Sequence, residues 1–221
     1  MRRPRTIAID GPVASGKSAV GRKLAERLGC AFLDTGLMYR AVTLAAVRGE
    51  VAVLDSAALE SLVDALQLDA VVSERGTRIL LDGEDVTEEL RLPVVEQAVS
   101  YVSQVGHVRE RMVEQQRAIA AKQPVVMVGR DIGTVVLPAA DLKVYLDAGV
   151  EERARRRYAE IPEKEDALTL EQIEAGLRER DRIDSGRAIS PLHPAEDAHI
   201  INTDGMTVDE VVSEIERLIE R

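Results

Sequence analysis

One short segment near the amino terminus has the residue types and the spacing of a phosphate-binding loop. It follows the pattern G-x-x-x-x-G-K-[ST] and consists of Gly11, Pro12, Val13, Ala14, Ser15, Gly16, Lys17 and Ser18. Its two glycines allow backbone angles that turn successive N–H groups toward phosphate oxygens, and the helix that continues through Ala19 adds its N-terminal dipole. Lys17 supplies positive charge to the β- and γ-phosphates, and the Ser18 hydroxyl can bind Mg²⁺. Residues 11–19 are therefore predicted to bind a nucleoside triphosphate with magnesium.

A second group of charged residues lies along one stripe of a predicted helix at 169–187. At about 100° per residue, this stripe contains Ile173, Leu177, Arg180, Asp184 and Arg187. The stripe starts apolar, as a face that packs inward does, and then becomes charged without leaving that face. We therefore expect its two arginines and its aspartate to face a ligand in a cleft rather than bulk water.

A phosphate-binding loop alone is compatible with a small-molecule kinase, a GTPase switch or a mechanical ATPase. Guanine-specific GTPases use an N-K-x-D motif, and the only asparagine here, Asn202, has no lysine after it. A mechanical ATPase normally has an acidic residue at the end of an apolar strand. Asp131 and Asp147 both follow apolar runs, and either could hold a metal through water, so the positions of the acidic residues do not exclude an ATPase. The arginines between residues 150 and 190 discriminate better, because such a cluster in an acidic chain indicates an anionic ligand.

The overall composition argues against several other classes of protein. The 221 residues include 29 Lys and Arg against 39 Asp and Glu, which gives a net charge of −10. An acidic chain with few aromatic residues is a poor candidate for binding nucleic acid or anionic membranes. The single cysteine, Cys30, fits a reducing compartment, and no apolar run is long enough for a signal h-region or a membrane span. We expect a soluble, cytoplasmic, monomeric protein.

Apolar runs alternate with amphipathic helical segments, which is the pattern of a parallel α/β sheet. Strands are predicted at 6–9, 31–33, 124–128, 142–146 and 199–201. Helices are predicted at 18–28, 37–47, 56–66, 94–121 with a bend or break at Gly106, 150–160, 169–187 and 207–221. Short β-prone pieces at 68–72, at 77–81 and around Val86 interrupt the alternation, and the segments 74–76 and 82–83 between them read as tight turns.

These elements predict a three-layer α/β core domain with two additions. The core takes residues 1–61, 104–149 and 188–221, residues 62–103 form an inserted β-containing subdomain, and residues 150–187 form a helical lid. We expect the lid to move without ligand, because its inward arginines would repel one another until phosphates arrive.

Four segments together resemble the bacterial cytidylate kinase family. They are the phosphate-binding loop, Asp34-Thr35-Gly36 with Tyr39-Arg40, Gly129-Arg130-Asp131-Ile132-Gly133-Thr134, and Glu179-Arg180-Asp181 through Asp184 to Arg187. The third segment, placed after a strand, is far more specific than the loop, and the resemblance runs in order over nearly the whole chain. Two positions depart from the family pattern: Thr35, where serine is common, and Gly106-His107, where a phenylalanine-proline pair is frequent.

The resemblance implies a P-loop nucleoside monophosphate kinase that transfers the γ-phosphate of ATP to CMP or dCMP. The insert would bind the acceptor, and the lid would close over ATP. The implied site residues are Ser100, Arg109 and Asp131 for cytosine; Tyr39, Arg180 and Asp184 for the acceptor sugar and its surroundings; Arg40, Arg130 and Arg187 for the acceptor phosphate; and Arg153 and Arg157 for the transferring phosphoryl group. Thr35 is implied as a further substrate-binding residue.

The chemistry of these residue types agrees with that assignment but leaves alternatives open. Cytosine presents an amino donor beside two acceptors, so Asp131 can accept while Arg109 and Ser100 donate. A phosphate acceptor is already ionised and needs no strong general base. Arginines would also bind UMP or another small anionic acceptor, so a kinase for a different acceptor is one alternative. A non-catalytic nucleotide-binding regulatory module that retains the phosphate-binding loop is another. Intact Lys17 together with the arginine stripe argues against the module.

Overall fold

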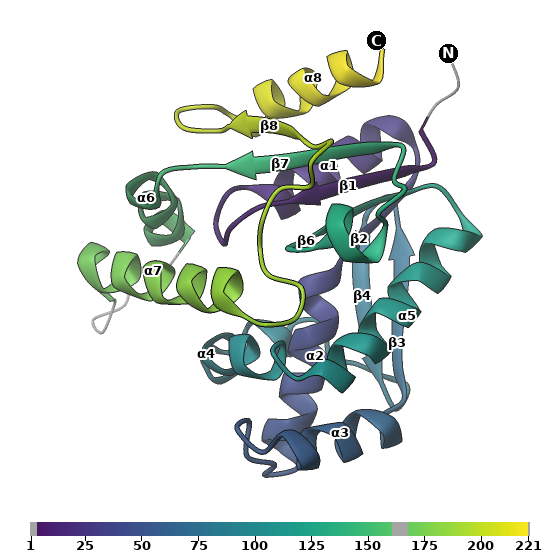
Figure 1. Cartoon of the computed structure of the whole chain (residues 1–221), viewed down its shortest axis with the longest axis vertical. Coiled ribbons are helices and arrows are strands. Elements are labelled where there is room, and N and C mark those ends of the chain that lie inside the picture. Colours follow the sequence, from purple (N-terminus) through teal and green to yellow (C-terminus); the bar gives the residue numbers. More distant parts are fainter. Residues whose placement is uncertain (1–3, 161–167, 221) are drawn as a thin grey trace.

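The computed structural model describes residues 4–160 and 168–220 as a sheet flanked by helices (Figure 1). In these ranges the strands are β1 Thr6–Asp10, β2 Ala31–Asp34, β3 Leu68–Ser73, β4 Gly76–Leu81, β5 Glu84–Asp85, β6 Val125–Gly129, β7 Leu142–Asp147 and β8 His199–Asn202. The helices are α1 Lys17–Leu28, α2 Thr35–Arg48, α3 Ser56–Ala65, α4 Pro93–Val102, α5 Gly106–Lys122, α6 Val150–Glu160, α7 Leu170–Gly186 and α8 Val208–Ile219, with a 3₁₀ turn at Glu89–Arg91 and a π turn at Ile132–Val136. Residues 161–167 of the predicted lid and residue 221 of the last predicted helix lie outside the described residues. None of the described helices is both long enough and apolar enough to cross a bilayer.

The strands of the described residues form one sheet in the order β5-β4-β3-β2-β6-β1-β7-β8. Strands β2, β6, β1, β7 and β8 pair in parallel, whereas β3, β4 and β5 add an antiparallel edge. The prediction of an α/β fold with a largely parallel central sheet is therefore confirmed.

Helices cover both faces of this sheet because the central strands are apolar on both sides. On β6, Val126 and Val128 pack into the cluster that contains α1 and α8, while Val125 and Met127 pack into the cluster that contains α2, α4 and α5. The same alternation places Ile7 and Ile9 of β1 on the α1 and α8 face. The helix α1 that follows the phosphate-binding loop is thus fixed against the middle of the sheet.

The predicted helix at 94–121 consists of two helices, α4 and α5, separated at residues 103–105. Ser103 Oγ and Gln104 Nε2 both donate to the carbonyl oxygen of Ser100, at 3.1 and 3.2 Å. These bonds satisfy a carbonyl in the last turn of α4, which would otherwise lack a partner. The break lies just before Gly106, the residue at which the sequence predicts a bend or break.

The inserted strands continue the core sheet. Strand β3 pairs with β2 at Ser73 and Phe32, and Thr77 Oγ1 of β4 donates to the Phe32 carbonyl at 2.8 Å. The turn between β4 and β5 has positive φ at both Asp82 (49°) and Gly83 (85°), as a two-residue hairpin turn requires. The division into core, insert and lid stays a prediction.

The substitution Gly21→Ala should destabilise the protein, because α1 approaches the sheet closely at this residue. A Cβ on Gly21 would lie 2.5 Å from Val128 Cγ1 and 2.8 Å from Phe32 Cε2. Overpacking of this kind costs about 1–3 kcal/mol, whereas replacing a helical glycine gains about 1 kcal/mol at most. We expect the Tm in thermal unfolding to fall.

Gly176→Ala is the matched control, since it changes a glycine in the interior of α7 where nothing lies within 4 Å of the added Cβ. There the gain in helix propensity acts alone, so the free energy of unfolding should rise by about 0.5–1 kcal/mol. A Gly21→Ala protein with an unchanged or higher Tm would contradict the close packing of α1 on the sheet.

Candidate active site

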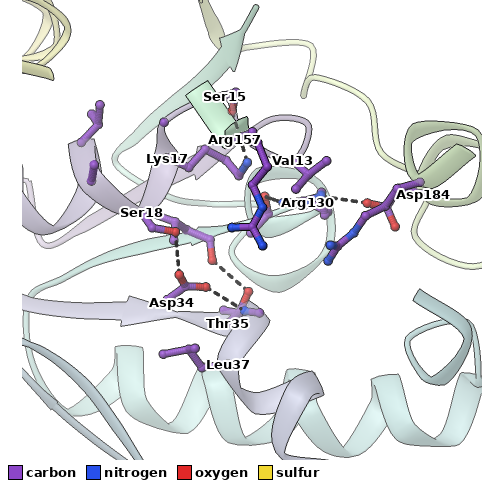
Figure 2. Close-up of a pocket in the computed structure, with 18 of the residues that line it drawn as sticks. Val13, Ser15, Lys17, Ser18, Asp34, Thr35, Leu37, Arg130, Arg157 and Asp184 are labelled. Carbon is purple, nitrogen blue, oxygen red and sulfur yellow. Dashed lines mark hydrogen bonds and ion pairs between the residues drawn. The ribbon is translucent and has the colours of Figure 1, made fainter. Parts of the chain in front are cut away.

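A cavity of ≈ 1190 Å³ opens beside the phosphate-binding loop, at the carboxyl ends of β2 and β6. Ligands of open α/β sheets bind at this edge. The predicted site residues on its wall are Val13, Ala14, Ser15, Gly16, Lys17, Ser18, Ala19, Thr35, Tyr39, Arg40, Ser100, Arg109, Arg130, Asp131, Arg157, Arg180, Asp184 and Arg187. The predicted residues that do not line it are Gly11, Pro12 and Arg153. Figure 2 shows Lys17, Arg130 and Arg157 around one part of this cavity.

The backbone of the loop depends on glycine at both ends. Gly11 has φ 148°, and a Cβ there would fall 2.1 Å from the Leu146 carbonyl oxygen. Gly16 has φ 91° and is the residue that precedes α1, so the helix begins with its free N–H groups at the cavity. Ala14 also has positive φ, 59°. This geometry is that of a loop whose amides form a concave anion-binding surface.

Lys17 is buried, with a relative exposure of 6%. Its Nζ donates to the Pro12 carbonyl and to Ser15 Oγ, the latter at 3.2 Å. Burial, and next the positive charge of Arg130, lower the pKa of the Lys17 ammonium well below its ordinary value, against the opposing charges of Asp34 and Asp10. A phosphate placed beside it would favour the charged form and so raise that pKa.

Ser18 and Asp34 form a pair of oxygen ligands at the loop. Ser18 Oγ donates to Asp34 Oδ2 at 2.6 Å, and the other carboxylate oxygen caps α2 by accepting from the Gly36 N–H at 3.0 Å (Figure 2). Hydroxyl and carboxylate oxygens are the ligands that Mg²⁺ prefers. The residues present therefore fit a magnesium ion that arrives with a nucleotide.

At the other end of the cavity, Arg109 of α5 and Asp131 form a buried ion pair between Arg109 Nη2 and Asp131 Oδ2. Both side chains are almost fully buried, at 3% and 6% relative exposure. Arg109 also donates to the Ser103 carbonyl at 3.1 Å, and its guanidinium lies 5.2 Å from the centre of the Tyr39 ring. A carboxylate and a guanidinium held side by side can read a planar ligand edge that has both donors and acceptors.

The segment that carries Asp131 is fixed by a second buried carboxylate, Asp10, at the end of β1. Its two oxygens accept from the Ile132 N–H at 2.8 Å and from the Gly133 N–H at 2.7 Å. Burial raises the pKa of the Asp10 carboxyl to about 6, although these two backbone bonds lower it. Asp10 thus joins the strand before the phosphate-binding loop to the segment after β6.

The stripe predicted on α7 meets Arg130 in the cavity. Arg130 Nε donates to Asp184 Oδ2 at 2.9 Å. Burial, and then the charge of Arg130, lower the pKa of Arg180 to about 10. Burial also lowers the pKa of Arg187, with the charge of Arg109 as the next cause. These arginines would gain from a bound anion, which would replace the solvation that they have lost.

Two of the arginines predicted to act from the lid, Arg153 and Arg157, are paired with carboxylates in this structure. Arg157 binds Glu96, Arg153 binds Asp181 at 2.6 Å, and the neighbouring Arg130 binds Asp184. Buried Arg180 Nε and Arg187 Nη2 have no hydrogen-bond partner among the described residues, and burial and then the charge of Arg130 lower the pKa of Arg180. The expected repulsion therefore acts on these two arginines, whereas Arg153 and Arg157 are neutralised by carboxylate partners. Those partners come from α4 and α7, elements that the helical pattern of α6 does not reveal.

Arg153, which the sequence predicts at the transferring phosphoryl group, does not line the cavity, whereas Arg156, for which no role is predicted, does. Arg153 is buried away from the cavity wall and donates to the Val13 carbonyl at 3.2 Å as well as to Asp181. Arg156 lines the cavity and donates to Thr203 Oγ1 at 3.1 Å. An added Cβ on Gly16 would lie 3.9 Å from Arg156 Nη1, so this guanidinium faces the phosphate-binding loop.

The predicted site residues leave out several charged residues that contribute to the site, among them Asp10, Asp34, Glu96 and Arg156. Asp10 and Asp34 had a detectable signal, because each is an acid at the end of a buried strand at the ligand-binding edge of the sheet. Arg156 shares a helix face with Arg153 and Arg157, the two arginines that the sequence predicts at the transferring phosphoryl group. Glu96 had no signal of its own, since its partners are distant in sequence.

The chain is similar to known proteins over nearly its whole length. The family model described as cytidylate kinase matches residues 7–221. The cytidylate kinase of Desulforamulus reducens is 47% identical over 221 residues, covering 100% of this chain and 99% of the relative. That of Pelotomaculum thermopropionicum is 50% identical over 210 residues, covering 95% and 93%.

Solved structures of low sequence identity support the fold alone. A shikimate kinase from Bacteroides thetaiotaomicron has a TM-score of 0.50 at 11% identity, covering 98% of each chain. An uncharacterized protein from Eubacterium ventriosum has a TM-score of 0.52 at 15% identity, covering 97% of each chain. The family model and the relatives of high coverage identify the chain further: it belongs to the cytidylate kinase family.

Proposed function

We propose that this protein transfers the γ-phosphate of ATP to CMP or dCMP, giving ADP and CDP or dCDP. The observation that carries the proposal is one continuous cavity with a phosphate-binding loop at one end and the buried Arg109–Asp131 pair at the other. Arginines lie between these ends, where the phosphates of a donor and an acceptor would meet. Membership in the cytidylate kinase family supports the same reaction.

The donor end is assigned to Mg-ATP. The amides of residues 11–19 and the Lys17 ammonium would bind the β- and γ-phosphates, and Ser18 with Asp34 would hold the magnesium ion that accompanies them. When bound, magnesium neutralises phosphate charge. Lys17 has little solvent to lose on binding, because it is already buried at the loop.

The acceptor end is assigned to the cytosine base and its phosphate. Asp131 accepts from the cytosine amino group while Arg109 and Ser100 donate to the ring nitrogen and carbonyl. Arg40, Arg130 and Arg187 bind the acceptor phosphate, and Tyr39, Arg180 and Asp184 surround the sugar together with Thr35. Asp10 keeps the Asp131 segment in place by accepting two of its backbone N–H groups.

Transfer between the two phosphates requires alignment and charge neutralisation rather than a general base. Arg157 lies on the cavity wall and can neutralise the transferring phosphoryl group. Arg153 is better suited to a positioning role, since it holds the Val13 carbonyl of the loop and Asp181 of α7. Arg156 is a further candidate for contact with the donor phosphates, because it faces Gly16.

Replacing Lys17 with alanine should reduce kcat by more than about tenfold while the fold remains intact. The lost ammonium would no longer neutralise charge that develops on the phosphates in the transition state, a contribution on the order of a few kcal/mol. Steady-state ADP release with CMP and Mg-ATP measures the effect, and thermal unfolding checks the fold.

Lys23→Ala is the control, because Lys23 lies on the same helix but pairs with Asp209 at the surface. Its kcat should stay within about twofold of wild type, since a surface ion pair contributes little. A folded Lys17→Ala protein that keeps more than about a tenth of wild-type kcat would show that the role of Lys17 is wrong.

Asp131→Asn should narrow the preference for CMP over UMP. The amide oxygen can still accept from Arg109, while the amide NH₂ presents a donor where the carboxylate presents an acceptor. Uracil carries a carbonyl in place of the cytosine amino group, so the variant suits uracil better. We expect the ratio of kcat/KM for CMP to that for UMP to fall by at least about a hundredfold.

The KM for Mg-ATP in the same variant distinguishes the alternative role of Asp131 as a metal ligand through water. A base-reading Asp131 leaves this KM nearly unchanged. If the KM for Mg-ATP rises while the CMP-to-UMP ratio stays at the wild-type value, the assignment of cytosine to this end of the cavity fails.

Helices α6 and α7 of the predicted lid should become more ordered when both nucleotides bind, because phosphates offer their arginines more negative charge than the carboxylates do. Hydrogen exchange in α6 and α7 measures this, with CMP and a non-hydrolysable ATP analogue added singly and together. Helix α8, which packs on α1, serves as the internal reference. Equal protection of α6 and α7 with and without both ligands would remove the lid from the mechanism.

A further inference from the structure

One acidic side chain lies among the arginines of the cavity and binds two of them at once. Glu96 of α4 accepts from Arg40 Nη1 of α2 through Oε1 at 3.0 Å and from Arg157 Nη2 of α6 through Oε2. Each carboxylate oxygen therefore has its own arginine, and the arginines come from different helices. Arg40 also donates to the Leu90 carbonyl at 3.2 Å, which holds its guanidinium toward α4.

The surroundings of Glu96 keep its carboxylate ionised. The side chain is half-buried, and burial alone would raise the pKa of its carboxyl. The charges of Arg40 and Arg157, with a further contribution from Arg180, outweigh burial and leave this pKa below its ordinary value. A half-buried anion that takes two guanidinium groups resembles a phosphate in charge and in geometry.

We propose that Glu96 acts as an internal competitor for the acceptor phosphate, which keeps Arg40 and Arg157 paired until that phosphate arrives and weakens the binding of acceptors that carry one. This inference rests on the proposed function, which assigns Arg40 to the acceptor phosphate and Arg157 to the transferring group. Without acceptor, the carboxylate neutralises both arginines and links α4 to α6. A phosphate bound at Arg40 repels the Glu96 carboxylate and replaces it there, and Arg157 is then released toward the phosphates.

If Glu96 competes with the acceptor phosphate, replacing it should change the affinity only of ligands that carry a phosphate. In Glu96→Gln the side chain keeps its size and one acceptor oxygen but loses the charge that a phosphate must displace. The apparent affinity of a ligand falls by the fraction of protein in the competent state, so removing the competitor should tighten binding of CMP by roughly three- to tenfold. Cytidine has the same base and sugar but no phosphate, and its affinity should not change.

Calorimetric titration of the whole protein with CMP and, separately, with cytidine tests this, using wild type and Glu96→Gln. Glu160→Gln is the matched control, since Glu160 pairs with the same Arg157 at 3.0 Å within α6 and does not link it to α4. The control should leave the CMP-to-cytidine ratio of Kd values at its wild-type value. Thermal unfolding confirms that each variant is folded.

A Glu96→Gln protein that binds CMP more weakly, or with unchanged affinity, overturns the competitor role and leaves Glu96 as a positioning residue for Arg40. A change of equal size for CMP and cytidine also overturns it, because Glu96 would then act on the base or the sugar. These outcomes leave the proposed function intact. That function fails separately if wild type binds neither CMP nor cytidine and releases no ADP from Mg-ATP in the presence of CMP.

Discussion

Buried positive charge is the constraint on which the rest of this site depends. Several phosphates can be bound together only where cations have already lost part of their solvation, and a cation without solvent is unfavourable until it is paired. The lowered pKa values of Lys17 and Arg180 express this cost. Asp184 and Glu96 offset it by pairing with arginines of the cavity. An overall net charge of −10 is therefore compatible with a binding site for anions.

The sheet order explains how donor and acceptor ends come together. Strand β6 lies between β2 and β1, so the segments after β1, β2 and β6 reach the same edge of the sheet. The phosphate-binding loop follows β1, Asp34 ends β2, and Asp131 follows β6. The bonds from Asp10 to the Ile132 and Gly133 amides fix two of these segments to each other. A displacement of the end of β1 would consequently also displace the segment after β6 that carries Asp131.

Local features of the fold could be predicted from the sequence because their causes are local. The Asp82-Gly83 pair needs positive φ at two successive residues, and the apolar start of the α7 stripe determines which face carries Arg180 and Asp184 inward. The choice between Arg153 and Arg156 could not be made in the same way. Residues three apart share a broad helix face, and only the packing of α6 against α7 and the loop decides which guanidinium reaches the cavity.

The carboxylates at the cavity show why ion pairs between residues distant in sequence cannot be predicted from sequence patterns. Glu96 and Arg157 are 61 positions apart, and their contact exists because the fold brings these two side chains, from α4 and α6, together at the cavity. In an isolated sequence Glu96 is an ordinary helical glutamate, whereas in the fold it gives two arginines a partner before any phosphate is present. An anion site assembled from arginines alone would bind any small anion. An internal carboxylate such as Glu96 lowers the apparent affinity of an anion that must displace it, and it keeps the two arginines neutralised until that anion arrives.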